Sequence, residues 1–187
     1  MRASVIKLRS GLFLDLRRPR PDQFVFSDIA GALSRICRFG SQTDRHYSVA
    51  EHLILCYQQS KMKTAWGPMA NRMVLLHDAA EAFVGDMVTP LKNMLPAYHE
   101  IEDRISNVIY DKYGVDLLGR AETHTRHVKP IDRYLLRRET RWLAEDESHK
   151  PPFDTRLGDP DFLGYPPAMA EFWYTYCAEQ AGIDTSK

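Results

Sequence analysis

Apolar side chains recur along most of this chain at the three- and four-residue spacing of amphipathic helices. Ser27 is a predicted N-cap for the first helix, and Gly40 is predicted to end it. Ser48 and Glu51 stand in the register of a capping box at the start of the second. The predicted helices cover about residues 27–39, 48–61, 68–84, 97–113, 129–145 and 168–181.

Two segments depart from this helical pattern. Residues 2–16 alternate loosely between apolar and polar around Ser10-Gly11, which predicts a short β-hairpin. Residues 148–167 are rich in Pro, Gly and Asp and are predicted to form a long ordered loop. Because no repeat or shift in composition divides the chain, the sequence predicts one all-α helical bundle with a small N-terminal β-hairpin. Its predicted parts are a hairpin and connector (1–20), a catalytic helical core (27–146), and a loop with a C-terminal helix (147–187).

Composition and charge narrow the class of protein. The 25 basic and 25 acidic side chains of this 187-residue chain cancel, so no net field attracts nucleic acid or an anionic membrane. No apolar stretch reaches the roughly 20 residues of a membrane helix, and the apolar segment within residues 1–13 is shorter than that of a secretory leader. A cytoplasmic protein is therefore expected. The three cysteines are odd in number and widely spaced, which indicates small core residues rather than a disulfide framework: Cys37, Cys56 and Cys177.

The predicted helices turn an unusual set of ionisable side chains inward. The set is His52, His77, Asp78 and Asp132, which offers two imidazoles and two carboxylates. Buried carboxylates are costly unless they are compensated, and a divalent ion such as Zn, Mn or Co would compensate them. Each histidine taken alone is also compatible with a hydrogen-bonded core residue. Two further acids close behind, Glu81 and Asp86, favour the metal site.

Four short motifs together resemble a known family. They are CRF (37–39), SVAEH (48–52), LLHDAAEAFVGDMVTPLK (75–92) and KPID (129–132). In this order and spacing they are similar to the HD-domain metal-dependent phosphohydrolases, in particular the 5'-deoxynucleotidase branch that includes phage dATP triphosphohydrolases. The likeness covers roughly residues 27–143. It implies a helical hydrolase that removes phosphate or triphosphate from a nucleotide.

The resemblance also implies roles for individual side chains. It makes His52, His77, Asp78 and Asp132 the metal ligands, Glu81 the acid/base group and Asp86 a second catalytic carboxylate. Arg38 matches an arginine near the substrate phosphate. Phe39 stands where the nucleotidases usually carry tryptophan, so it keeps a stacking surface without an indole N–H. Lys92 can add a point charge for phosphate or remain a solvated surface lysine.

Several alternatives remain open at this stage. A regulatory domain would bind a nucleotide at the same site without turnover, and a purely structural metal site would only stabilise the fold. Extra imidazoles from His99, His124 and His127 would allow a second ion, although their spacing favours surface positions. Apolar helix faces around Ile101 and Phe172 suit self-association, so a homo-oligomer is expected.

Overall fold

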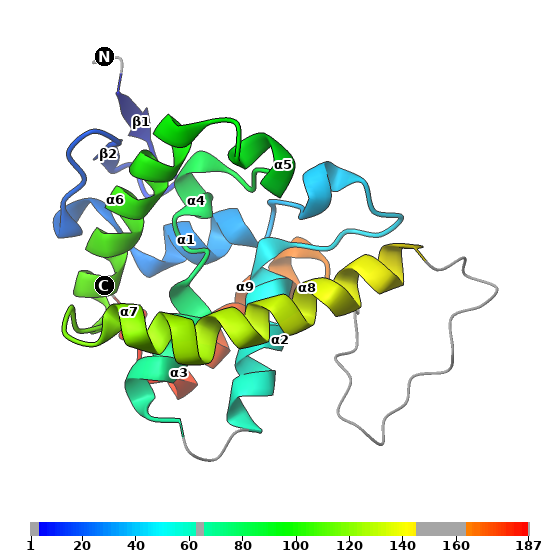
Figure 1. Cartoon of the computed structure of the whole chain (residues 1–187). Helices are drawn as coiled ribbons and strands as arrows, with labels where there is room; N and C mark the ends of the chain where they lie inside the picture. Colours follow the sequence, from blue (N-terminus) through cyan, green and yellow to red (C-terminus); the bar gives the residue numbers. More distant parts are fainter. Residues whose placement is uncertain (1–3, 63–65, 145–163, 187) are drawn as a thin grey trace.

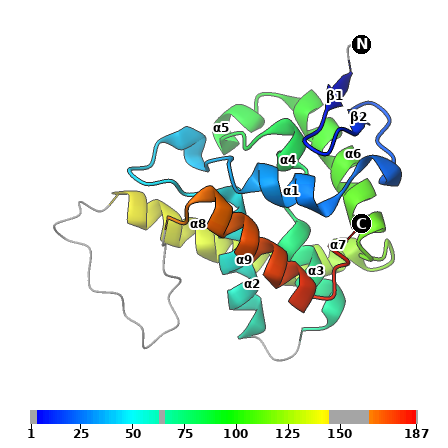
Figure 2. The ribbon, with the colours of Figure 1, turned by 180° about the vertical axis from the view of Figure 1, so that it is seen from behind.

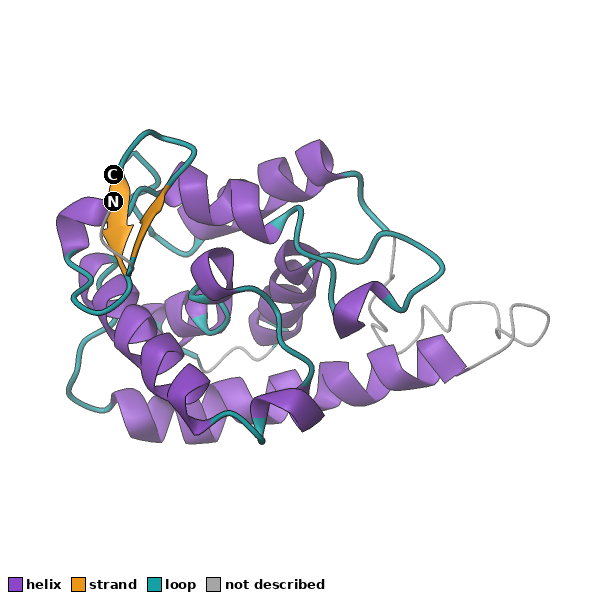
Figure 3. Ribbon diagram, turned by 90° about the horizontal axis from the view of Figure 1, so that it is seen from above, coloured by secondary structure: helices purple, strands orange, loops and turns teal. Residues whose placement is uncertain are grey.

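The computed structural model describes residues 4–62, 66–144 and 164–186 and shows a mostly helical protein with one small β-hairpin (Figure 1). The hairpin consists of β1 (Val5–Lys7) and β2 (Phe13–Asp15). The α-helices are α1 (Phe26–Leu33), α2 (Val49–Lys61), α3 (Pro68–Leu76), α4 (Glu81–Val84), α5 (Thr89–Lys92), α6 (Pro96–Lys112), α7 (Arg120–Thr123), α8 (Lys129–Ala144) and α9 (Pro167–Gln180). The prediction of a helical bundle with a small N-terminal hairpin is confirmed. Figure 3 shows the same arrangement from above, with the strand pair at one end.

The hairpin is fastened to the bundle by its turn. Ile6 pairs with Leu14 in the antiparallel register, and Leu14 is completely buried. The backbone N–H and the hydroxyl of Ser10 both donate to the carboxylate of Asp28 on α1, at 2.8 and 2.6 Å. These bonds explain why a two-stranded element, marginal by itself, is ordered here.

Helix α2 lies at the centre of the protein. It packs against α3, α8 and α9, and α9 crosses it on the face seen in Figure 2. Every residue from Val49 to Tyr57 is buried, so α2 is enclosed on all sides rather than along one face. The Ser48 hydroxyl accepts the Glu51 N–H at 3.2 Å, as the capping register predicted. The carboxylate of Glu51 does not close the capping box but accepts the backbone N–H groups of Gly164 and Tyr165.

The prediction for the first helix is wrong at both ends. Val25, not Ser27, occupies the N-cap position of α1, and the helix ends at Leu33 instead of continuing to Gly40. Beyond it Cys37 forms an isolated β-bridge with Ser48. Backbone groups that a longer helix would use are therefore paired with the segment that leads into α2.

The predicted helix over residues 68–84 is broken in the middle. α3 ends at Leu76 and α4 begins at Glu81. Between them the chain tightens, with the Ala79 N–H bonded to the Leu76 carbonyl and the Glu81 N–H to the Asp78 carbonyl. Gly85, with φ +84°, ends α4 as expected. The His77-Asp78 pair consequently lies in a turn that points both side chains toward α2.

The other long helices follow the sequence pattern closely, whereas the short helices α5 and α7 and a π-helical turn were not predicted. α6, α8 and α9 match the predicted ranges within one residue. Residues 124–128 form a π-helical turn that joins α7 to α8. Residues 148–163 of the predicted loop lie outside the described part of the chain. Among the residues described, no helix has both the length and the apolar character needed to cross a membrane.

Candidate metal centre

The four predicted metal ligands come from three elements and meet in one place. His52 lies on α2, His77 and Asp78 in the turn after α3, and Asp132 in the first turn of α8. The Nε2 atom of His52 is 3.5 Å from Asp132 Oδ1 and 3.8 Å from Asp78 Oδ2. The Nε2 atom of His77 is 3.3 Å from the same Asp78 oxygen. Donors that share one ion at about 2.0–2.2 Å lie roughly 3 to 3.5 Å apart, so the 3.3 and 3.5 Å distances match a shared ion and the 3.8 Å distance is slightly longer.

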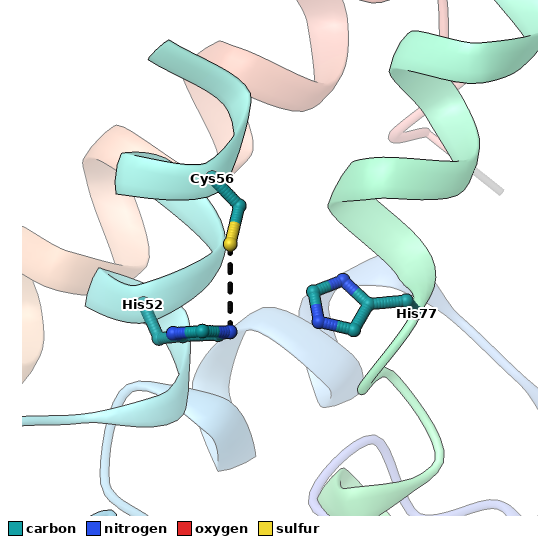
Figure 4. Close-up of side chains that lie close together, drawn as sticks. All are labelled: His52, Cys56 and His77. Atoms are coloured by element: carbon teal, nitrogen blue, oxygen red, sulfur yellow. Dashed lines mark hydrogen bonds between the residues drawn. The ribbon is translucent and has the colours of Figure 1, made fainter. Parts of the chain in front are cut away.

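A fifth donor, which the sequence did not lead us to expect, adjoins this cluster. The donor atoms of His52, Cys56 and His77 all lie within 4.8 Å of one another, and Figure 4 shows His77 facing the other two side chains. The Sγ atom of Cys56 is 3.4 Å from His52 Nε2. Cys56 is fully buried, as predicted for a core residue, but its sulfur adjoins the site. Its position four residues after His52, one turn further on the same helix face, was the overlooked signal.

His52 is oriented from behind by Glu139 of α8. The Nδ1–H of His52 donates to Glu139 Oε1 at 2.6 Å, which directs the Nε2 atom toward the cluster. Glu139 also accepts the Tyr47 hydroxyl at 2.6 Å and Arg38 Nη2 at 3.0 Å. Burial alone would raise the pKa of Glu139, but the charges of His52 and Arg38 lower it to about 2. Sequence reasoning missed Glu139, although it follows Asp132 by two helical turns.

His77 presents its ring to the same space from the opposite side. Its Nδ1–H donates to the Val74 carbonyl at 2.7 Å, so Nε2 carries the lone pair. That Nε2 atom is buried and has no hydrogen-bond partner among the described residues. A buried nitrogen without a partner is costly, and a metal ion would satisfy it. The orphaned nitrogen therefore fits the metal centre that the donor set suggests.

Two further acids lie beside the cluster. Glu81, the first residue of α4, is 4% exposed, and its Oε2 has no hydrogen-bond partner in the described part of the chain. Burial raises the pKa of Glu81 well above its usual value, and the charges of Asp78 and Asp86 raise it further. Burial also raises the pKa of Asp86, with a further contribution from Asp78 that the charge of Arg38 opposes. Without a cation, this acidic group therefore holds protons more tightly than free carboxyls do.

The three predicted substrate-binding residues differ in their surroundings. Arg38 is 10% exposed and lies between two acids, since its Nη1 is 3.6 Å from Asp78 Oδ2 while Nη2 bonds Glu139. Phe39 packs against the core with a left-handed φ of +56°, in a strained turn next to that arginine. The Nζ atom of Lys92 is 2.6 Å from Glu102 Oε1, so this lysine is ion-paired rather than freely solvated.

A cavity of about 500 Å³ opens beside the cluster, with His77 and Asp78 in its wall. Lys92, Tyr110 and His124 also line it. We expected His124 on the surface, but it begins the π-helical turn and is half-buried in this wall. Burial lowers the pKa of His124, and the charge of nearby His77 lowers it further, which favours the neutral imidazole. π-Helical turns are frequent at functional sites, which agrees with this location.

Two curated proteins are similar to this chain over most of its length. It is 37% identical over 144 residues to the uncharacterized protein YfdR of Escherichia coli, covering 77% of this chain and 75% of YfdR. It is 33% identical over 142 residues to an uncharacterized protein of Rhodobacter capsulatus, RCAP_rcc00048, covering 74% and 72%. No profile of a known protein family matches the chain. At this identity and coverage, the chain belongs to the family of Escherichia coli YfdR.

Proposed function

We propose that this protein is an HD-domain type, metal-dependent hydrolase that removes phosphate or triphosphate from deoxynucleotides. One observation carries the proposal: His52, His77, Asp78 and Asp132 converge from three elements, and two of them, His77 and Asp78, line a cavity. The cavity volume of about 500 Å³ lies in the range of small-molecule sites. The motif resemblance supplies the reaction class, and this geometry supports it.

The donor set suggests what the site would hold. Two imidazole nitrogens, two carboxylates and a nearby thiol suit zinc, cobalt or iron, and the carboxylates also suit manganese. When bound, such an ion lowers the pKa of a water from 15.7 toward about 7 and polarises a phosphoryl oxygen.

The residues around the ligands have separate roles in the proposed reaction. We assign phosphate pairing to the guanidinium of Arg38, which lies beside Asp78 and whose Nε atom has no partner among the described residues. The carboxyl of Glu81 retains its proton well above the usual pKa and can donate it to the leaving oxygen. The cavity beyond His77 is left for the nucleoside, with the Tyr110 ring in its wall.

Product analysis tests the proposal directly. The purified chain is incubated with dAMP or dATP and Mn²⁺, Co²⁺ or Zn²⁺, and release of phosphate, pyrophosphate or triphosphate is measured. Glu81→Gln is expected to lower turnover by about 10²- to 10⁴-fold while the bound metal is retained. Glu179→Gln, an exposed change on α9, is the matched control and leaves turnover unchanged.

Each competing interpretation predicts a different result. Nucleotide binding without any product would favour a regulatory domain. A metal-dependent fold that neither binds nor hydrolyses nucleotides would favour a purely structural ion, and Asp78→Ala would then unfold the protein.

A further inference from the structure

We propose that Cys56 is a direct ligand of the metal ion, so that α2 contributes a histidine and a thiolate to one centre. This inference deepens the proposed function and rests on its metal site. It adds a sulfur donor to the two imidazoles and two carboxylates of the predicted set. The centre is thereby assigned a preference for metals that bind sulfur.

The distance between the two α2 donors fits a shared ion. A metal–nitrogen bond of about 2.0–2.1 Å and a metal–sulfur bond of about 2.3 Å place N and S roughly 3.1 to 3.8 Å apart for angles of about 90° to 120° at the metal. In the structure Cys56 Sγ and His52 Nε2 are 3.4 Å apart. Without metal the two atoms share a hydrogen bond at this distance. Metal binding replaces that hydrogen bond, and the protons held by the thiol and by Nε2 leave to solvent as the metal–sulfur and metal–nitrogen bonds form.

Neighbouring groups fix the direction in which the His52 ring points. Because a carboxylate only accepts, the 2.6 Å contact with Glu139 requires a proton on Nδ1. The Nε2 atom then faces Cys56, Asp78 and Asp132, whose donor atoms lie 3.4 to 3.8 Å away. These four atoms form a donor set that one cation can bridge once their protons have left.

A second, independent observation comes from the facing side of the site. The Nε2 atom of His77 belongs to a side chain that is 6% exposed, and it has no hydrogen-bond partner among the described residues. A ring nitrogen of His77 lies within 4.8 Å of the donor atoms of both His52 and Cys56, and Figure 4 shows the ring facing these two side chains. An ion between the three atoms would satisfy this nitrogen and coordinate the thiol together.

The other cysteines provide an internal contrast. Cys177 on α9 lies in a groove with Tyr57 and Trp173, while Cys37 sits in the bridge to Ser48. Neither takes part in the histidine cluster that contains Cys56. Cys177 is buried like Cys56, so it serves as a control for the loss of a buried thiol.

A thiolate ligand would determine which metals the centre prefers. Thiolates select zinc, cobalt and ferrous iron, whereas magnesium and manganese prefer oxygen donors. The wild-type chain is therefore expected to bind Zn²⁺ and Co²⁺ far more tightly than Mn²⁺. Cys56→Ser replaces the sulfur by a hydroxyl oxygen. In this variant the difference between the affinities for Zn²⁺ or Co²⁺ and the affinity for Mn²⁺ is expected to become smaller.

Cobalt spectroscopy of the full-length chain tests the sulfur–metal bond without reference to activity. Wild-type protein loaded with one Co²⁺ is expected to show a near-ultraviolet thiolate-to-cobalt charge-transfer band. Cys56→Ser and Cys56→Ala should lose this band, and chelator competition should show a Kd for Co²⁺ raised roughly tenfold or more. Cys177→Ala should retain both the band and the affinity.

The outcomes separate this inference from the proposed function. Bound cobalt without a charge-transfer band in the wild type overturns the role of Cys56 and leaves the four predicted ligands intact. Failure of the wild-type chain to bind Co²⁺ or Zn²⁺ overturns both. If the Cys56 variants do not fold, the wild-type and Cys177→Ala spectra still decide the question.

Discussion

The two sides of His52 solve the problem of buried charge in different ways. Behind the ring, Glu139 is completely buried, yet it accepts hydrogen bonds from three donors. In front, Asp78, Glu81 and Asp86 crowd together, and one Glu81 oxygen has no partner among the described residues. The pKa of Glu139 is lowered, whereas those of Glu81 and Asp86 are raised. The first group is fully hydrogen-bonded within the protein, whereas the second carries acidic groups that a bound cation would compensate.

This difference indicates a division of labour between support and chemistry. A saturated carboxylate behind a metal-binding histidine fixes the tautomer and the ring orientation before any metal arrives. An acidic cluster in front supplies the charge that attracts the ion and the proton that a reaction needs. Arg38 touches both groups, because it contacts Glu139 and Asp78.

The largest expected effect is on stability, and it follows from removing the Glu139 carboxylate behind His52. Glu139→Ala leaves a hydroxyl, an imidazole and a guanidinium buried without their shared acceptor, and it should lower the free energy of unfolding by roughly 3–5 kcal/mol. Urea unfolding in the presence of a chelator measures this loss without a contribution from metal. Glu139→Gln keeps an acceptor oxygen and should lose clearly less. A loss below about 1 kcal/mol for the alanine variant would contradict a supporting role.

Much of the helical framework could be predicted because it depends on local sequence patterns. The stripe in α6 and the Ser48 cap of α2 depend on residues within a few positions of one another. The candidate ligands were also accessible from sequence, since imidazoles and carboxylates on apolar helix faces are rare and expensive.

Features that depend on distant pairing could not be predicted in this way. α1 ends early because Cys37 pairs with Ser48, and the helix carrying His77 breaks so that its ring can face α2. The importance of Glu139 comes from its contact with His52, 87 residues earlier in the chain. In the sequence Cys56 has the pattern of an ordinary core residue, and only the fold brings the His77 imidazole close to it.

A smaller effect is the pH dependence of stability, in which Glu139 and Glu81 are expected to act in opposite directions. In the metal-free protein the lowered pKa of Glu139 should make stability rise as pH increases from about 2 toward 4.5. Glu81 acts in the opposite sense, because its pKa in the folded protein lies above the usual 4.5. Its contribution to stability is therefore fully present below pH 4.5. That contribution is lost as the pH rises through the pKa of the folded state. One such group gives a slope of at most about 1.4 kcal/mol per pH unit.

Chemical unfolding over a pH series, with a chelator present, measures both slopes. Glu81→Gln should remove part of the decline above pH 4.5 and leave the acid limb unchanged. Added Zn²⁺ should reverse the decline in the wild type, because the ion compensates the same charges. Parallel curves for wild type and Glu81→Gln would show that Glu81 is not the titrating group.

The smallest effect comes from removing one donor of Glu139 instead of the acceptor. Tyr47→Phe deletes the 2.6 Å hydroxyl contact, but His52 and Arg38 still satisfy the carboxylate. The expected loss of stability is therefore about 1 kcal/mol, the ordinary value of one hydrogen bond. Because the His52 contact with Glu139 is retained, the Kd for Zn²⁺ should not change, as chelator competition would show. A weaker Zn²⁺ affinity in Tyr47→Phe would mean that the hydroxyl helps to hold the imidazole in place, and that the support behind the metal centre extends one residue further than Glu139.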